Sequence, residues 1–180
     1  MTRRIVFIDK KISYDDRHNS PLLGKFINCM MLDGKKSVAE RVVYTALDAA
    51  AKKLELNPLT LFEKVVSNAK IEYRILKRKV GANTVQIPHP VDEHKQISMT
   101  LIMLKNTIRE LQEKSKTSVI SCMENVFLNT YKNSGEVIKK KEEIDQTAIK
   151  NRVFSHYSWM SKKIRKKNII KKKKQTTDNM

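Results

Sequence analysis

The stretch from Arg74 to Val91, RILKRKVGANTVQIPHPV, constrains the fold most, because it has the pattern of a β-hairpin. Side chains alternate between the two faces of a strand, and two strand-like runs flank a short loop that contains a glycine. The return run Thr84 to Ile87 alternates as well, and Pro88 and Pro90 cannot donate to a full ladder, which confines the return strand to an edge. A two-stranded ribbon with an open edge cannot form a core. The body of the protein must therefore come from other segments.

The ribbon carries its cations toward the tip and its apolar residues at the base. Lys77, Arg78 and Lys79 lie near the loop, whereas Ile75 is expected in a seam between the ribbon and the rest of the protein. The lysines could serve only to prevent edge-to-edge aggregation of a solvated hairpin. Alternatively, the ribbon is an arm that binds a polyanion, and a basic patch on a projecting element favours nucleic acid.

Apolar residues recur at intervals of three and four in six other stretches, which predicts about six helices. Ser20 and Pro21 have the pattern of a helix start, and this first helix is expected to stop at Asp33-Gly34. The second helix is expected to begin with a capping box between Ser37 and Glu40. Asn57-Pro58 would open the third helix.

Three further helices are expected after the ribbon. Asp92 and Glu93 suit the first turn of the fourth helix, because carboxylates there oppose the positive end of the helix dipole. The fifth helix is expected at about 117–133 and the sixth at 137–151. Lys139, Lys140 and Lys141 crowd the start of the sixth helix and oppose its dipole, which indicates that function overrides stability there.

Taken together, these patterns predict a mainly α protein, a bundle of about six helices with one protruding two-stranded antiparallel β-ribbon. Residues 1–19 are expected to form an extended basic arm, residues 20–160 a single helical domain with the ribbon at about 72–91, and residues 161–180 a basic tail.

The charge balance points to a polyanionic partner. The 180 residues include 37 Lys or Arg against 19 Asp or Glu, a net charge of +18. Such an excess works against compactness unless a polyanion neutralises it, so nucleic acid is the leading partner and an anionic membrane surface the alternative. No apolar run approaches the roughly 20 residues of a membrane-spanning helix. The first residues also lack the pattern of a signal or transit peptide, so we expect a protein without a membrane partner that works where it is made.

Neither catalysis nor metal binding is expected. With four glycines, the chain has no Gly-rich nucleotide loop, and no Ser or Cys stands in a recognisable nucleophile motif. Cys29 and Cys122 lie far apart, and the four histidines form no metal-binding spacing. We therefore expect no catalytic residue, no metal and no cofactor.

Basic segments recur on the arm, in a turn, on the ribbon, on the last helix and in the tail. Cations distributed in this way suit a folded RNA, on whose single-stranded bases Tyr157 and Trp159 could stack. These aromatic residues could equally pin the last helix onto the core. A helical DNA-binding transcription factor is the alternative function. The predicted helices use their apolar faces for packing and the charge is concentrated on arms and turns, which disfavours a recognition helix in a major groove.

Three segments, taken in order and spacing, resemble one family. They are LLGKFINCMMLDGKKSVAERVVYTAL from Leu22, KRKVGANTVQIP from Lys77 and KKKEEIDQTAIKNRVFSHYSWM from Lys139. They are similar to the bacterial and organellar form of the universal small-subunit ribosomal protein seven, over about residues 1–160. The resemblance implies a structural constituent of the small ribosomal subunit that binds ribosomal RNA of the subunit head and nucleates head assembly. It also implies neighbouring ribosomal proteins as partners and a position beside the exit site of messenger RNA and transfer RNA.

The resemblance also assigns residues. The RNA-binding candidates are Arg3, Arg4, Lys10, Lys11, Lys25, Lys35, Lys36, Lys77, Arg78, Lys79, Lys139, Lys140, Lys141, Arg152, His156 and Tyr157. The ribbon tip, Gly81, Ala82 and Asn83, falls where the family approaches exit-site transfer RNA and messenger RNA. Ala82 replaces a second glycine of the family, and Asp92, Glu93 and His94 stand where the family commonly carries arginines, which puts RNA contact there in doubt.

The amino-acid composition gives a further expectation about origin. Lysine outnumbers arginine 28 to 9, and Ile and Asn are plentiful, as expected of translation from an AT-rich genome. We therefore expect an organelle-encoded mitochondrial protein, with a plastid or a bacterial cytoplasm as the alternatives.

Overall fold

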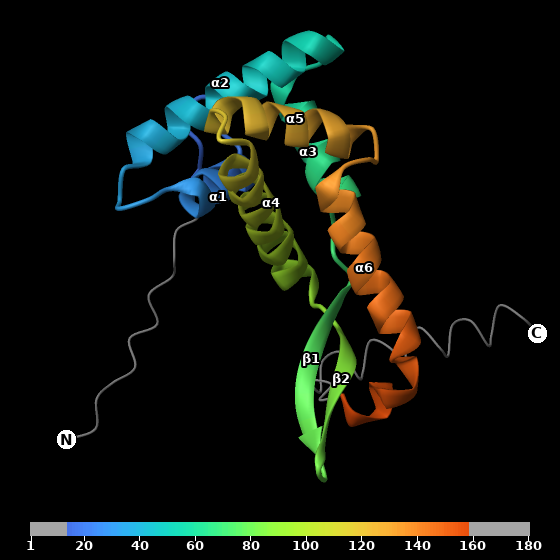
Figure 1. Ribbon diagram of the computed structural model, residues 1–180. Helices are drawn as coiled ribbons and strands as arrows, with labels where there is room; N and C mark the ends of the chain where they lie inside the picture. Colours follow the sequence, from blue (N-terminus) through green and yellow to red (C-terminus); the bar gives the residue numbers. More distant parts are fainter. Residues whose placement is uncertain (1–13, 159–180) are drawn as a thin grey trace, which may run out of the picture.

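The protein is mainly helical with one protruding ribbon, as the sequence predicts. The computed structural model describes residues 14–158, so the greater part of the expected N-terminal arm and the whole C-terminal tail lie outside it. The elements, labelled in Figure 1, are α1 (Pro21–Met30), α2 (Lys36–Leu54), α3 (Pro58–Asn68), β1 (Tyr73–Val80), β2 (Asn83–Pro90), α4 (Glu93–Ser115), α5 (Val119–Tyr131), α6 (Glu136–Lys150) and the 3-10 helix η1 (Arg152–Tyr157).

Helices α1 to α5 form a bundle around an aromatic centre. Phe26 of α1, Phe62 of α3 and Phe127 of α5 have no exposed surface, and their ring centroids lie 5.3 to 6.1 Å apart. Aromatic rings at such separations pack edge to face or tilted, which stabilises them beyond simple burial. The apolar stripes recognised in the sequence therefore converge on one core.

Two of the expected helix starts are confirmed. Ser20 Oγ accepts a hydrogen bond from the Leu23 amide at 3.4 Å, and Pro21 follows it as the first residue of α1. Asn57 Oδ1 accepts from the Leu59 amide at 3.1 Å ahead of Pro58 and α3. In both cases the side chain satisfies an amide that has no partner within the helix.

The connection between α1 and α2 differs from expectation. Helix α1 ends at Met30, before Asp33 and Gly34, which both have positive φ values (49° and 73°) and form a turn of their own. The predicted capping box is wrong, because α2 already begins at Lys36 and has no side-chain cap. Glu40 instead lies 3.3 Å from the Lys36 ammonium, one helical turn away.

The ribbon includes both of its prolines. Its eight-residue strands pair antiparallel from Tyr73 opposite Pro90 to Val80 opposite the first residue of β2. The Val91 amide donates to the Glu72 carbonyl at 3.0 Å, so every second residue of β2 directs its backbone amide toward β1. Pro88 and Pro90 occupy the positions in between, where an amide would point away from β1. Both prolines therefore fit inside the strand.

A two-residue turn closes the ribbon. Gly81 has a φ of +63° and Ala82 has no positive φ, a pattern that matches the type II′ hairpin turn. Ala82 is compatible with this turn, because only the first position needs the left-handed region.

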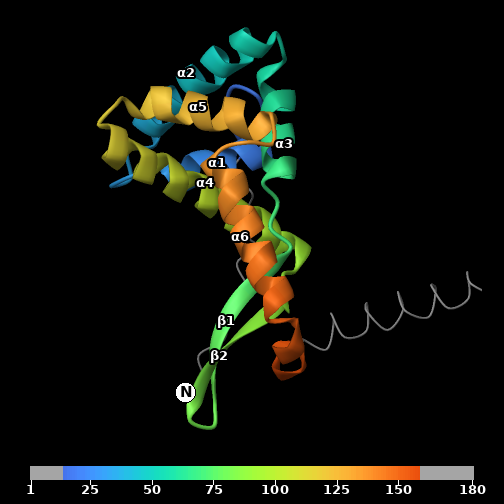
Figure 2. The same ribbon diagram turned by 45° about the vertical axis from the view of Figure 1, so that its right-hand side comes forward.

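Helix α6 connects the bundle to the ribbon. Its first half packs on α4 and α5, and its second half lies along β1, followed by η1 against β2. Both ribbon views show α6 running from the bundle toward the ribbon (Figures 1 and 2). At the base of the ribbon Ile87 is 2 % exposed and Pro88 is buried, whereas Ile75, the residue expected in the seam, is only half-buried.

None of the helices within residues 14–158 combines the length and the apolar character that crossing a membrane requires.

Candidate nucleic-acid interface

Of the three cations predicted near the ribbon tip, two are unpaired within residues 14–158 and one is engaged. The Lys77 and Lys79 side chains are exposed and make no hydrogen bond or ion pair within residues 14–158. Arg78, on the other face, donates from its guanidinium to the Tyr157 carbonyl at 2.8 Å and thereby ties η1 to the ribbon. Of the three predicted ribbon cations, Lys77 and Lys79 are therefore the two with unpaired side chains.

The residues of η1 are displayed at the surface. Tyr157 is 37 % exposed, and the His156 ring lies 3.9 Å from its ring, centroid to centroid. Arg152 is exposed at the start of η1. None of these side chains enters the core, so the aromatic pair is accessible to a base. Trp159 lies outside the described residues.

The turn between α1 and α2 also carries one unpaired and one paired predicted cation among the described residues. Lys35 is exposed, and its side chain makes no hydrogen bond or ion pair in the described part of the chain, whereas Lys36 pairs with Glu40. Lys25 of α1 is exposed and also unpaired among residues 14–158.

The three lysines of α6 point in different directions. Lys139 is exposed, Lys140 forms an ion pair with Glu110 of α4, and Lys141 donates to the Asn68 carbonyl at 2.7 Å. Successive helical residues are rotated by about 100°, which explains the divergence. For Lys140 and Lys141 these partners offset the expected conflict with the helix dipole.

Helix α4 carries a cationic face that the sequence reasoning missed. We define the α4 stripe as Lys95, Ser98, Ile102, Lys105 and Arg109, which share one helix face because they repeat at intervals of three and four. Its three cations make no side-chain hydrogen bond or ion pair in the described part of the chain. The same periodicity that revealed the apolar face of α4 would have revealed this stripe.

The upper end of the stripe meets the α1–α2 turn. Arg109 and Lys35 line one pocket of about 300 Å³, together with Met30, Leu32 and Val38. Two unpaired cations from distant parts of the sequence thus come together. At the other end, Lys95 follows directly after the Asp92–His94 segment.

A polar cluster attaches the chain to α2 just ahead of α1. The Tyr44 hydroxyl donates to the buried Asp15 carboxylate, whose other oxygen accepts from the His18 amide at 2.9 Å. Burial and the adjacent Asp15 charge raise the pKa of Tyr44, and the hydrogen bond to Asp48 at 2.7 Å raises the pKa of Arg17. This cluster holds residues 15–18 at one place, while Arg3, Arg4, Lys10 and Lys11 lie outside the described residues.

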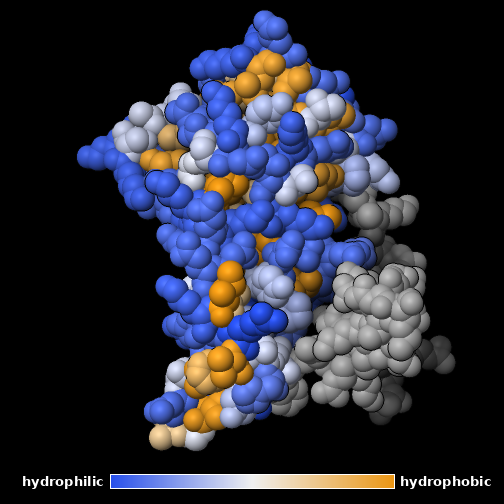
Figure 3. Space-filling model, turned by 90° about the vertical axis from the view of Figure 1, so that its right-hand side faces the viewer, coloured by the Kyte–Doolittle hydropathy of each residue, from blue (hydrophilic) through white to orange (hydrophobic). Residues whose placement is uncertain are grey.

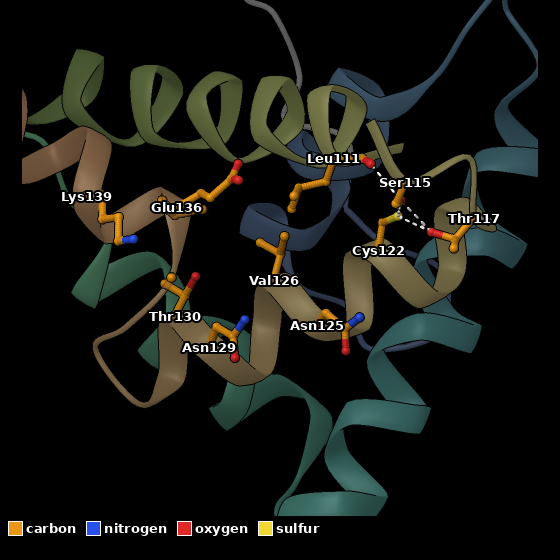
Figure 4. A pocket seen from close by; sticks show the side chains of 12 residues that line it. Leu111, Ser115, Thr117, Cys122, Asn125, Val126, Asn129, Thr130, Glu136 and Lys139 are labelled. Carbon is orange, nitrogen blue, oxygen red and sulfur yellow. Dashed lines mark hydrogen bonds between the residues drawn. The ribbon is translucent and has the colours of Figure 1, made fainter. Parts of the chain in front are cut away.

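The pocket between α4, α5 and the start of α6 has no catalytic arrangement (Figure 4). It has a volume of about 440 Å³, and its lining includes Glu136 and Lys139 but no histidine. Cys122 Sγ lies 3.1 Å from the Thr117 hydroxyl, which in turn hydrogen-bonds to Ser115, so these groups satisfy one another. Within residues 14–158, no three His, Cys, Asp or Glu residues come together to hold a metal ion.

The surface on the α6 side is mainly hydrophilic. Figure 3 shows hydrophobic residues there only in small separate groups among hydrophilic ones. A charged surface of this kind suits a partner that is itself charged and hydrated.

Comparison with known proteins agrees with this geometry. The family model described as ribosomal protein S7p/S5e matches residues 2–152. The chain belongs to this family. It is 38 % identical over 160 residues to small ribosomal subunit protein uS7 of Leptospira biflexa, and 36 % identical over 159 residues to the uS7 protein of Vibrio vulnificus. Each match covers 88 % of this chain and 100 % of the relative.

Membership of the S7 family confirms the resemblance seen in the three sequence motifs. The chain is a ribosomal protein, a constituent of the small subunit that takes part in translation. Its relatives are structural proteins of the ribosome, which agrees with the expectation that the chain is not an enzyme. A uS7 protein of Borrelia hermsii, 34 % identical over 160 residues, extends the match to a further bacterial ribosome.

Proposed function

We propose that the chain binds ribosomal RNA of the small-subunit head through the α4 stripe and the unpaired cations around it. The observation that carries this proposal is the separation of the charges. Several acidic residues, including Glu40, Glu110 and Glu124, are paired with lysines elsewhere, whereas Lys95, Lys105 and Arg109 have no acidic partner among residues 14–158. Unpaired cations on one face are available to phosphates.

The spacing of the stripe fits an extended contact. From Lys95 to Arg109 is 14 residues, about 21 Å along a helix. Cations distributed over such a length can neutralise several phosphates, and each neutralised phosphate releases a counterion. Together with the ribbon, the turn and the arm, on the order of ten cations would be engaged, so affinity should fall steeply with salt.

The RNA-binding surface of the proposal comprises both predicted and newly found residues. Lys25, Lys35, Lys77, Lys79 and Lys139 are supported by their exposed, unpaired side chains, and Arg152 by its exposure. His156 and Tyr157 supply stacking surfaces for unpaired bases. Lys36, Lys140 and Lys141 contribute less, because their ammonium groups already have partners in the free protein.

The ribbon tip is proposed to lie beside exit-site transfer RNA and messenger RNA. Gly81, Ala82 and Asn83 are exposed at the end of the ribbon farthest from the bundle (Figure 1). An element that projects in this way can reach a ligand that the bundle does not touch. Nucleation of head assembly and contacts with neighbouring ribosomal proteins complete the role that the family implies.

The origin of the chain is part of the proposal. We place it in a mitochondrial ribosome of bacterial type, on the excess of lysine over arginine, 28 to 9. The relatives named above are bacterial, which fits an AT-rich bacterium as well as an organelle of bacterial descent. Locating the coding sequence on an organellar or a bacterial genome decides between the two.

A competition experiment tests the RNA assignment. The full chain is bound to a labelled transcript of the small-subunit head, and unlabelled head RNA or duplex DNA of equal length is added at equal concentration. We expect displacement by the RNA alone and co-sedimentation of the protein with the small subunit. Equal displacement by duplex DNA would contradict the proposal.

A further inference from the structure

We propose that α6 acts as a strut that sets the direction of the ribbon relative to the bundle, and that Lys140 and Lys141 are positioning residues at its upper end. The ribbon joins the bundle only through the short links after α3 and before α4. Both links are held to α4, because the Ile71 amide donates to the Thr100 hydroxyl at 3.4 Å and the Gln96 side-chain amide donates to the Val91 carbonyl at 3.0 Å. These contacts fix only the base of the ribbon, so its direction needs a further support that touches both bodies, and α6 is placed to provide it.

Lys140 attaches the strut to α4. Its ammonium donates to the Glu110 carboxylate and to the Thr107 hydroxyl, the latter at 3.3 Å. Thr107 is fully buried, so one of the two partners is fixed in the bundle core. Lys140 also lowers the pKa of Glu110, because a nearby cation favours the ionised carboxylate.

Lys141 attaches the strut to the ends of two other helices. Its ammonium donates at 2.7 Å to the carbonyl of Asn68, the last residue of α3. The Asn68 side-chain amide donates in turn to the carbonyls of Thr130 and Tyr131 at the end of α5, at 3.1 and 3.2 Å. Carbonyls at a helix C-terminus have no partner within the helix, and a cation there is attracted by the negative end of the helix dipole. One lysine thus joins α6 to α3 directly and to α5 through Asn68.

The lower end of the strut is attached to the ribbon. Helix α6 contacts both strands of the ribbon, and Ala148, near the end of α6, is 7 % exposed. Beyond α6, the Arg78 guanidinium of β1 holds the Tyr157 carbonyl at 2.8 Å. The strut is therefore attached at both ends, by ionic and polar contacts above and by packing and one charged hydrogen bond below.

Neighbouring lysines consequently have separate tasks. Lys139, whose exposed ammonium is unpaired within residues 14–158, is the member of the trio that can bind phosphate in the free protein. Lys140 and Lys141 use their charges inside the molecule. A change in either should alter where the ribbon points while leaving the bundle folded.

The test is a distance measurement in the full chain without RNA. Spin labels are placed at Lys52 of α2 and Gln86 of β2, both exposed, after Cys29 and Cys122 are replaced by alanine. The parent should give one narrow distance distribution between the labels. Lys141→Met and Lys140→Met should broaden or shift it, whereas the matched control Lys139→Met should leave it unchanged.

Rescue separates positioning from mere loss of charge. Lys141→Arg keeps a donor for the Asn68 carbonyl and should restore the narrow distribution, as should the exchanged pair Lys140→Glu with Glu110→Lys. Unchanged distributions in both methionine variants would overturn the proposal. The proposal would also be overturned if the two methionine variants lowered the melting temperature as far as a core variant does, because the lysines would then stabilise the bundle itself.

The distance measurement is independent of RNA binding, because it is made without RNA. If the chain bound duplex DNA as well as head RNA, the proposed function would fail, and the distances would still decide the role of the strut.

Discussion

The bundle and the ribbon are held in place by different forces. Phe26, Phe62 and Phe127 meet in the bundle without exposed surface, whereas the ribbon buries Ile87 and Pro88 and leaves most of its residues in solvent. Burial of apolar surface is the largest favourable contribution to folding, so the bundle should be the more stable part of the protein. The direction of the ribbon depends on a few polar contacts. One molecule thus combines a stable body with an arm whose position single side chains control.

The largest effect is expected in the bundle. Phe127→Ala removes a fully buried ring and leaves a cavity, which should lower the free energy of unfolding by about 3–5 kcal/mol. Urea denaturation followed by circular dichroism measures the change. Leu32→Ala, at a residue 60 % exposed, is the control and should change little. Similar losses in both variants would remove the distinction between core and surface.

A smaller and more local effect is expected at the base of the ribbon. Ile87→Ala should lower the free energy of unfolding by about 2 kcal/mol. This is the low end of the range for buried aliphatic residues, because fewer atoms pack around a side chain in the ribbon than in the bundle. Hydrogen exchange should speed up in β1 and β2 before it does in α5. Ile75→Ala, at the half-buried position, should have the weaker effect. A larger loss for Ile75→Ala than for Ile87→Ala would place the seam between ribbon and bundle at Ile75, as the sequence alone suggested.

The smallest effect concerns pH and the Lys140 contact. Because Lys140 lowers the pKa of Glu110 from its ordinary value of 4.5, the pair stabilises the fold above that value and loses this contribution as pH falls through the lowered pKa. The Glu110 side chain is 46 % exposed, so the effect on stability is small. The label distances of wild type and Glu110→Gln should therefore differ at neutral pH and converge in acid. A constant difference across this range would contradict the assignment.

Local patterns predicted much of the fold because their causes are local. The Asn57-Pro58 start of α3 and the Gly81 turn depend on a few neighbouring residues, and the structure has both. The Ser37–Glu40 box failed although its sequence pattern was complete. The turn at Asp33 and Gly34 lets α2 begin at Lys36, which places Ser37 inside the helix and pairs Glu40 with a lysine.

The site was harder to predict because the role of a cation depends on distant partners. Lys139, Lys140 and Lys141 are identical in sequence terms, yet Glu110 and Asn68, which engage two of them, lie 30 and 73 residues away. The α4 stripe could have been found, since its spacing of three and four is visible in the sequence. Only the structure shows that its cations have no partner within residues 14–158.

The salt dependence of RNA binding tests the central claim most directly. The variant Lys95→Met, Lys105→Met, Arg109→Met is compared with Lys52→Met, Lys116→Met, Lys132→Met, which removes three exposed lysines outside the stripe. Each lost phosphate contact should reduce the slope of log affinity against log salt by about one, so the stripe variant should lose about three and the control little. Equal losses in the two variants would show that net charge alone, and not the α4 stripe, binds the RNA.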